Sequence, residues 1–312
     1  MSQPIPVMLL PQSGYHLEEL ISKIELIFET FQDNLPDQGS SVLLKPNLVK
    51  TAPRHVAAQT DPEFMRAMIL CCQNKGWKVT VGDSPAIGSA RQVGKASGLT
   101  AVCDELKVDL ITLEGATTHN IDGRTTSIAS NIKKFDAVIN CPKLKGHGQL
   151  YYTGAVKNLY GCVGGKRKVV RHITMGDKNE GQLFAQMLLD VATAVKPCLT
   201  IVDGIDAMAG RGPLNGKRVS ENILVASTNP IALDWHLIHH LKGDISKDPV
   251  SNLIQNNPAY ENDIKTVALT PKGLPKLGDF YFPGDEERKP ISFHPWIILR
   301  FIYRNFKQKL SA

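Results

Sequence analysis

Short apolar runs rich in β-branched residues alternate with amphipathic segments of helical periodicity through most of the chain. The runs predicted as strands are 41–44, 77–81, 108–113, 137–140, 199–202, 223–226 and 266–269. The segments predicted as helices are 16–31, 61–72, 89–98, 182–194 and 230–241. Strands that alternate with helices are joined by crossover connections, so the pattern predicts an α/β fold with largely parallel sheets and helices on both faces.

The chain has 312 residues, a length that suits one large domain or two modest ones. We expect a single α/β unit over 1–312. An alternative within it is a pair of lobes, about 1–135 and 136–290, with a crevice between them.

Composition narrows the classes of function. The 36 basic and 30 acidic residues give a net charge of +6, a mild excess that favours a small anionic ligand and argues against nucleic acid. The six cysteines include no CxxC spacing, so the chain contains no iron–sulfur cluster motif. The absence of a secretion signal and of a long apolar run leads us to expect a cytoplasmic protein.

A basic amphipathic helix is predicted over 295–310, near the end of the chain. One stripe is apolar and includes Trp296, Leu299 and Phe306, and another carries Arg300 and Arg304. Two interpretations stay open: peripheral contact with an anionic membrane surface, or packing against the domain or a partner subunit.

Polar residues stand directly after five of the predicted strands, where ligands bind in open α/β sheets. These junctions are Lys45-Pro46-Asn47, Gly82-Asp83-Ser84-Pro85, Asn140-Cys141-Pro142-Lys143, Asp203-Gly204 and Ser227-Thr228-Asn229-Pro230. We expect them to converge on one site.

The segment from Asn140 to His172 is the richest in reactive side chains. Lysines bind anions, or act as nucleophiles when a neighbouring charge lowers their pKa. Histidines ligate metals or transfer protons near neutral pH. We therefore predict Lys157, His147 and His172 as catalytic residues, with His147 and His172 as candidate metal ligands.

Residues predicted to bind a cofactor follow the same strand ends. They are Lys45, Asn47, Asp83, Ser84, Lys143, Lys145, Asn158, Gly161, Asp203, Gly204, Gly210 and Gly212. The glycine-rich loop 203–216 offers spare backbone donors for an anion, although a simple turn is an equal alternative. The chain has no P-loop and no GxGxxG fingerprint, so the usual nucleotide motifs are absent.

Six ordered segments between about Ser41 and Asp234 resemble the domain of unknown function family 362. They are Leu43-Leu-Lys-Pro-Asn-Leu48, Gly82-Asp-Ser-Pro85, Asn140-Cys-Pro-Lys-Leu-Lys-Gly-His147, Gly154-Ala-Val-Lys-Asn-Leu-Tyr-Gly161, Val202-Asp-Gly-Ile205 with Gly210-Arg-Gly-Pro213, and Asn229-Pro-Ile-Ala-Leu-Asp234. Many members of that family carry an appended ferredoxin-like module. Since this chain lacks one, electron transfer would require a separate redox partner.

The order of His147, Lys157 and His172 is also similar to that in the lactate racemase group, which uses a nickel-pincer nucleotide tethered to a lysine. This resemblance implies that Lys157 holds or faces the cofactor. The histidines would then be metal ligands or an acid/base pair.

Together these features predict an enzyme, an isomerase or oxidoreductase, that binds a small anionic substrate or cofactor and depends on a divalent metal or nucleotide-type cofactor. The alternative is a non-catalytic carrier or scaffold that delivers a metal, iron–sulfur cluster or cofactor to a partner.

Overall fold

The structure, a computed structural model, describes residues 3–164, 168, 171, 181–270, 273 and 275–288. Its centre is a ten-stranded sheet whose main path runs β12-β1-β11-β10-β7-β2-β3-β4. These strands are β1 (Ile5–Pro11), β2 (Ser41–Pro46), β3 (Lys78–Asp83), β4 (Asp109–Thr112), β7 (Ala137–Cys141), β10 (Leu199–Ala209), β11 (Lys217–Ser227) and β12 (Thr266–Leu269). Along this path only β11 runs against its neighbours, so the sheet is largely parallel, as predicted.

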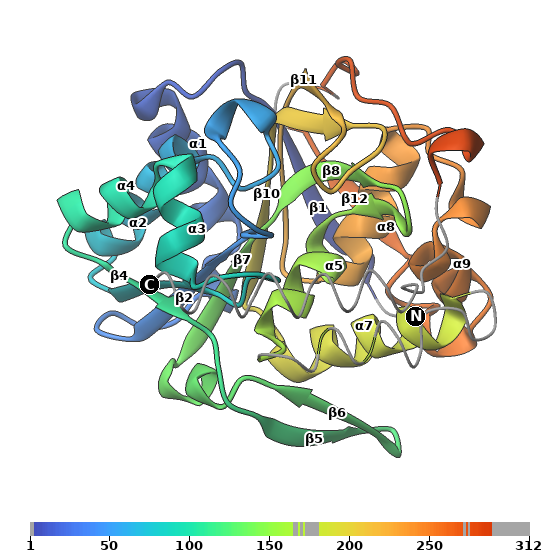
Figure 1. Ribbon diagram of the computed structural model, residues 1–312, viewed down its shortest axis with the longest axis horizontal. Helices are drawn as coiled ribbons and strands as arrows, with labels where there is room; N and C mark the ends of the chain where they lie inside the picture. Colours follow the sequence, from blue (N-terminus) through green and yellow to red (C-terminus); the bar gives the residue numbers. More distant parts are fainter. Residues whose placement is uncertain are drawn as a thin grey trace.

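Helices cover both faces of the sheet (Figure 1). One group is α1 (Leu17–Thr30), α2 (Pro62–Asn74), α3 (Ala90–Ser97) and α4 (Leu99–Glu105); the other is α5 (Ala155–Leu159), α7 (Gln182–Val195), α8 (Pro230–His240) and α9 (Pro249–Gln255). Val42 and Leu44 pack with the first group, whereas Leu43 packs with α5 and α7. A strand buried on both faces accounts for the unbroken apolar run at 42–44.

Short 3-10 helices complete the connections. They are η1 (Gln32–Asn34), η2 (Arg54–Val56), η3 (Ser130–Lys134), η4 (Tyr160–Cys162), η6 (Ile245–Lys247), η7 (Pro258–Tyr260) and η8 (Asp285–Glu287).

Local signals account for where several helices begin and end. The Asp61 carboxylate accepts a hydrogen bond from the Glu63 N–H at the start of α2, which has Pro62 in its first turn. Ser89 and Gln92 form a capping box at the start of α3. These starts agree with the sequence predictions.

The structure corrects two predictions next to the site. The predicted glycine-rich loop 203–216 is wrong in its first half, because β10 continues to Ala209 and pairs with β11 across an irregularity at Gly204/Asp206. The segment after Asn140, predicted only as a polar junction, forms β8 (Lys143–His147), which pairs with β10 and with β9 (Tyr151–Thr153). In both cases partners distant in sequence supply the strand pairing, which local composition does not reveal.

Several elements were not predicted, among them the short elements α4, α5, α9 and β9 and two larger features. One is β1; the other is the hairpin of β5 (Thr117–Ile121) and β6 (Arg124–Ile128), which projects from the body beside α7 (Figure 1). Arg124 on β6 pairs with Asp190 on α7, with 2.9 Å between Nη2 and Oδ1.

The predicted amphipathic helix at 295–310 lies outside the described residues, and the division into two lobes stays a prediction. Among the described residues, no helix has both the length and the apolar character needed to cross a membrane.

Candidate functional site

The carboxyl ends of β2 and β3 are joined by a buried ion pair. Lys45 Nζ lies 2.8 Å from Asp83 Oδ1. The other Asp83 oxygen accepts a hydrogen bond from the Leu48 N–H at 2.6 Å. Gly161 lies directly against this pair, because a Cβ at that position would overlap both Asp83 Oδ1 and Lys45 Nζ. A glycine is therefore the residue that this packing admits.

Asn158 on α5 links the helix to two strands. Its amide oxygen accepts hydrogen bonds from Asn47 Nδ2 at 2.9 Å and from Lys45 Nζ at 3.3 Å. Its amide nitrogen donates to Asn140 Oδ1 at 2.8 Å and to the Lys45 carbonyl at 3.2 Å. A fully bonded buried amide of this kind fixes the position of α5 over the strand ends.

Lys145 on β8 is buried, and the acceptors that it meets in the described part of the chain are neutral. Its Nζ donates to Asn47 Oδ1 at 2.7 Å and to the Ala58 carbonyl at 3.0 Å. Burial lowers the pKa of Lys145 well below its usual value, and the positive charge of Lys157 lowers it further.

Lys157 extends from α5 beside these groups. Within the described residues its Nζ makes no ion pair and no hydrogen bond, and its polar head lies 5.3 Å from the centre of the Tyr160 ring. Burial, and then the charge of Lys45, lower the pKa of Lys157 to about 8. This amine is therefore partly neutral near physiological pH, unlike an ordinary lysine.

Lys168 adds a further ammonium group. Its Nζ donates to the backbone carbonyl of Ser84 and lies 3.5 Å from the Gly161 carbonyl. Burial lowers its pKa to about 8 as well, while the nearby Asp83 raises it.

Asp234 on α8 holds the first turn of α5. Its carboxylate accepts hydrogen bonds from the N–H groups of Ala155 at 2.7 Å and Val156 at 2.8 Å. The Tyr152 hydroxyl donates to it at 3.1 Å. Burial raises the pKa of Asp234 to about 7, although the donated N–H bonds oppose the rise. This carboxylate positions the residue that follows, Lys157.

A second buried group lies where β8 and β10 pair. Lys143 Nζ lies 2.8 Å from Asp203 Oδ2 and 2.8 Å from the Tyr15 hydroxyl, which donates to Asp203 Oδ1 at 3.0 Å. Burial raises the pKa of Asp203 and also that of Tyr15, for which the charge of Asp203 is a further cause. Lys143 is thus neutralised within the protein.

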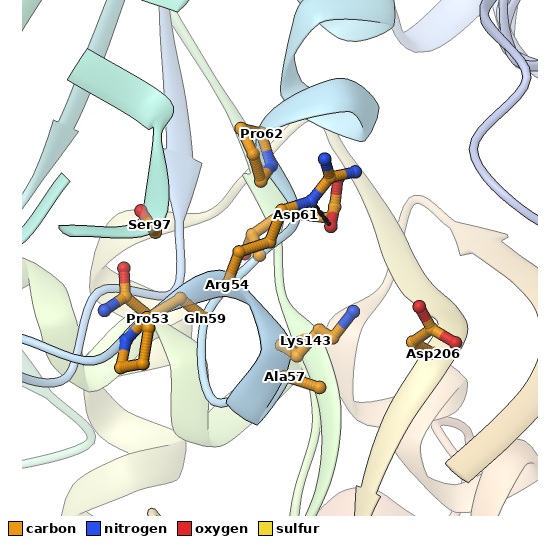
Figure 2. A pocket seen from close by; sticks show the side chains of 10 residues that line it. Pro53, Arg54, Ala57, Gln59, Asp61, Pro62, Ser97, Lys143 and Asp206 are labelled. Atoms are coloured by element: carbon orange, nitrogen blue, oxygen red, sulfur yellow. Dashed lines mark hydrogen bonds and ion pairs between the residues drawn. The ribbon is translucent and has the colours of Figure 1, made fainter. Parts of the chain in front are cut away.

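A small polar pocket opens beside this second group (Figure 2). It is lined by Pro53, Arg54, Ala57, Gln59, Thr60, Asp61, Pro62, Ser97, Lys143 and Asp206. Arg54 forms two hydrogen bonds to the Asp61 carboxylate, at 2.8 and 2.9 Å, so its charge is also balanced.

His147 ends β8 and is buried. Its Nδ1 accepts hydrogen bonds from the Gln149 and Leu150 N–H groups, at 3.2 and 3.1 Å. Nδ1 is therefore engaged with the following turn, and a neutral ring carries its proton on Nε2. His172 lies outside the described residues. Among the described side chains, no three of His, Cys, Asp and Glu gather in a way that could hold a metal ion. The catalytic and metal roles of the two histidines stay predictions.

The glycines of the predicted cofactor loop face the protein itself. The Gly210 N–H donates to the Tyr281 carbonyl at 3.0 Å, and the Gly212 N–H donates to the Gly210 carbonyl at 2.8 Å. Gly204 lies within β10, where a Cβ would press on Ile223. The expectation of spare donors thus does not hold at Gly210 and Gly212.

The structure brings most of the predicted cofactor-binding residues together. One connected group consists of Lys45, Asn47, Asp83, Ser84, Lys145, Asn158 and Gly161. The other group, where β8 and β10 pair, contains Lys143 and Asp203. Sequence reasoning missed Tyr15 as a site residue, because β1 was not recognised and Tyr15 follows its carboxyl end. Asp234 was named only within a motif of the family resemblance. Its position inside the predicted helix 230–241 gave no sign of its contact with α5.

The family described as a domain of unknown function (DUF362) matches residues 42–239, a span that contains most of this site. The chain belongs to this family.

A curated relative is similar over nearly the whole chain. It is a thylakoid-associated protein from Synechocystis sp., 34% identical over 319 residues, an alignment that covers 96% of this chain and 94% of the relative.

Two solved structures are similar to part of this chain. The lactate racemase apoprotein from Thermoanaerobacterium thermosaccharolyticum has a TM-score of 0.49 and 11% identity, and the match covers 77% of this chain and 57% of the racemase. A protein from Thermotoga maritima has a TM-score of 0.42 and 12% identity, with 64% of this chain and 52% of that chain covered.

Proposed function

We propose that this DUF362 protein is an enzyme that binds a small anionic substrate or cofactor where β2, β3 and β7 end, with Lys157 as the amine that contacts or attacks it. The observation that carries the proposal is the state of Lys157. It is a partly buried ammonium group beside Lys45, without an ion pair or hydrogen bond in the described part of the chain. A buried charge without a partner is costly, and an anionic ligand removes that cost.

The chemistry of Lys157 fits an isomerase or oxidoreductase reaction in which an amine acts as a base or a nucleophile. An amine with a pKa of about 8 supplies both a neutral base and an ammonium ion at neutral pH. The hydrogen bonds of the Asn158 amide hold α5 in place, so the backbone of Lys157 has a fixed position.

A nucleotide-type cofactor attached to the chain fits Lys157, since this amine has no partner in the described residues that attachment would displace. His147 does not fit as a metal ligand through Nδ1, which already accepts two backbone hydrogen bonds. Such a cofactor, when bound, would supply the electron acceptor of the reaction. Lys157 would orient it from α5.

The test is Lys157→Met, with Lys95→Met as the control because Lys95 is exposed on α3. Copurifying small molecules are identified by native mass spectrometry, and affinities for phosphate and acetate are measured by calorimetry. We expect Lys157→Met to weaken anion binding at least tenfold and to abolish any covalent adduct, while Lys95→Met changes neither. Equal anion affinities and equal adduct content in both variants would overturn the proposal.

The second candidate is a carrier or scaffold that works at a membrane surface. The supporting observation is that the 34% identical relative is described as thylakoid-associated. The predicted basic amphipathic stripe at 295–310 would supply the contact. The test is flotation with anionic and with neutral vesicles, for the full chain and for a chain that ends at 294. Equal flotation of both chains would show that the segment 295–312 does not bind the membrane surface.

A further inference from the structure

The lysines of the site differ in what neutralises them. Lys45 faces Asp83 and Lys143 faces Asp203, each at 2.8 Å. Lys145 faces an amide oxygen and a carbonyl. Lys168 faces carbonyls, and in the described segments Lys157 faces the Tyr160 ring alone. Among the described residues, therefore, three ammonium groups at the site lack a carboxylate.

Lys157 lies near both of the other amines. The Nζ atoms of Lys157 and Lys168 lie 5.3 and 6.0 Å from the centre of the same Tyr160 ring. Lys145 is linked to α5, which carries Lys157, through Asn47, since Asn47 bonds both Lys145 and Asn158. The charge of Lys157 lowers the pKa of Lys145, and it also lowers that of Lys168. Like charges in a buried site repel more strongly than they do in water. A single negative charge would leave most of this repulsion in place, whereas a compact dianion would relieve it.

We propose that the ligand of this site carries a phosphate monoester, bound through Lys145, Lys157 and Lys168. This inference rests on the proposed function and adds the class of the anion to it. A phosphate monoester carries a charge of nearly −2 above its second pKa of about 6, and it has three acceptor oxygens within a small volume. Lysine binds such a group as a point charge with three rotatable donors.

Asn47 allows one of the unbalanced charges to be neutralised without removing a lysine. Its Oδ1 lies 2.7 Å from Lys145 Nζ, so Asn47→Asp places a carboxylate against that ammonium group. The change also removes the Nδ2 donor to Asn158 Oδ1, so Lys168→Met, which keeps that hydrogen bond, is measured beside it. The matched control is Asn34→Asp, which adds the same charge at an exposed position in η1.

The experiment measures affinities of the full chain for inorganic phosphate, acetate and succinate by calorimetry at pH 7.5 and constant ionic strength. We expect phosphate to bind at least tenfold more tightly than acetate and succinate. Asn47→Asp should weaken phosphate binding about tenfold and leave acetate within threefold, whereas Asn34→Asp should change neither. Thermal unfolding shows whether Asn47→Asp is folded. Lys168→Met serves as the second variant, with the same expected loss for phosphate.

The possible failures separate the two proposals. Acetate affinity equal to that of phosphate, with both lost in Lys157→Met, would overturn the phosphate assignment and leave the proposed function standing. Tightest binding of succinate would assign a dicarboxylate instead. If no anion binds and Lys157→Met changes nothing, both proposals are wrong.

Discussion

Lys45 Nζ and Asp83 Oδ1 lie 2.8 Å apart at the ends of adjacent parallel strands, with the Lys45 side chain fully buried and that of Asp83 4% exposed. Several contacts hold this ion pair in position. Asp83 also accepts backbone N–H groups from Leu48 and Ser84, and Gly161 packs on it without space for a side chain. The amines without carboxylates are arranged around this neutral pair.

Removing the Asp83 charge should destabilise the fold strongly. Asp83→Asn leaves Lys45 as a buried ammonium without its counter-ion, and breaking a buried pair in this way costs about 3–5 kcal/mol. The free energy of unfolding from urea titration measures the loss. Asp285→Asn is the control, because Asp285 pairs with Lys247 at an exposed position, where solvent screens the charges and the pair contributes little to stability. Equal losses in the two variants would contradict the assigned role of the buried pair.

A methyl group at position 161 should disturb the same pair. Gly161→Ala would place a Cβ against Asp83 Oδ1 and Lys45 Nζ, so one partner must move, and we expect a loss of about 1–3 kcal/mol. Gly39→Ala is the control, since a Cβ there meets nothing within 4 Å and only its positive φ opposes the change. The melting temperatures of the two variants test this expectation, and that of Gly161→Ala should be the lower. A Gly161→Ala protein as stable as wild type would show that the side chains of Lys45 and Asp83 can move to accommodate a methyl group without loss of stability.

Lys157 should react with amine reagents at lower pH than other lysines. Its pKa is lowered to about 8, so at pH 8 about half of it is neutral, whereas an ordinary lysine with a pKa near 10.4 is less than about 1% neutral. Limited acetylation followed by peptide mass spectrometry, between pH 6.5 and 10, should give a midpoint near 8 for Lys157. Lys95 provides the reference in the same sample. Saturating phosphate should raise the Lys157 midpoint, because an anion favours the ammonium form. Parallel profiles for the two lysines would contradict the lowered pKa.

Asp234 should act on ligand affinity through α5. In Asp234→Asn one of the two carboxylate oxygens becomes an NH₂ group. The side chain can then no longer accept hydrogen bonds from both Ala155 and Val156, so we expect a loss of about 1–3 kcal/mol in stability. Because Lys157 follows this turn, anion affinity should also fall.

The control for Asp234 is Asp248→Asn. Asp248 is likewise buried and caps a helix, accepting from the Ser251 N–H at 2.9 Å at the start of α9, which carries none of the site lysines. We expect a similar loss of stability with unchanged anion affinity. If calorimetry shows that both variants bind anions as wild type does, Asp234 only stabilises the fold.

The pairing of β1, antiparallel to β11 and parallel to β12, explains why Tyr15 was not predicted as a site residue. The segment Ile5–Pro11 holds two prolines and begins the chain, so it gave no clear strand signal, yet it pairs with β11 and β12. This pairing brings Tyr15 against Asp203, 188 positions away. Contacts at that separation depend on the assembled sheet.

The sequence by itself determined the alternation of strands and helices, the start of α2 at Asp61 and of α3 at Ser89, and the lysines that follow the strands. These features depend on periodicity, capping and neighbouring residues, which act within a few positions. Only the tertiary structure decided which lysines are neutralised. Lys45 and Lys143 meet carboxylates, while Lys145 meets an amide and Lys157 an aromatic ring. The partner of each amine comes from a strand or helix elsewhere in the chain. Because these amines are buried, the partner decides whether the charge of the amine is neutralised.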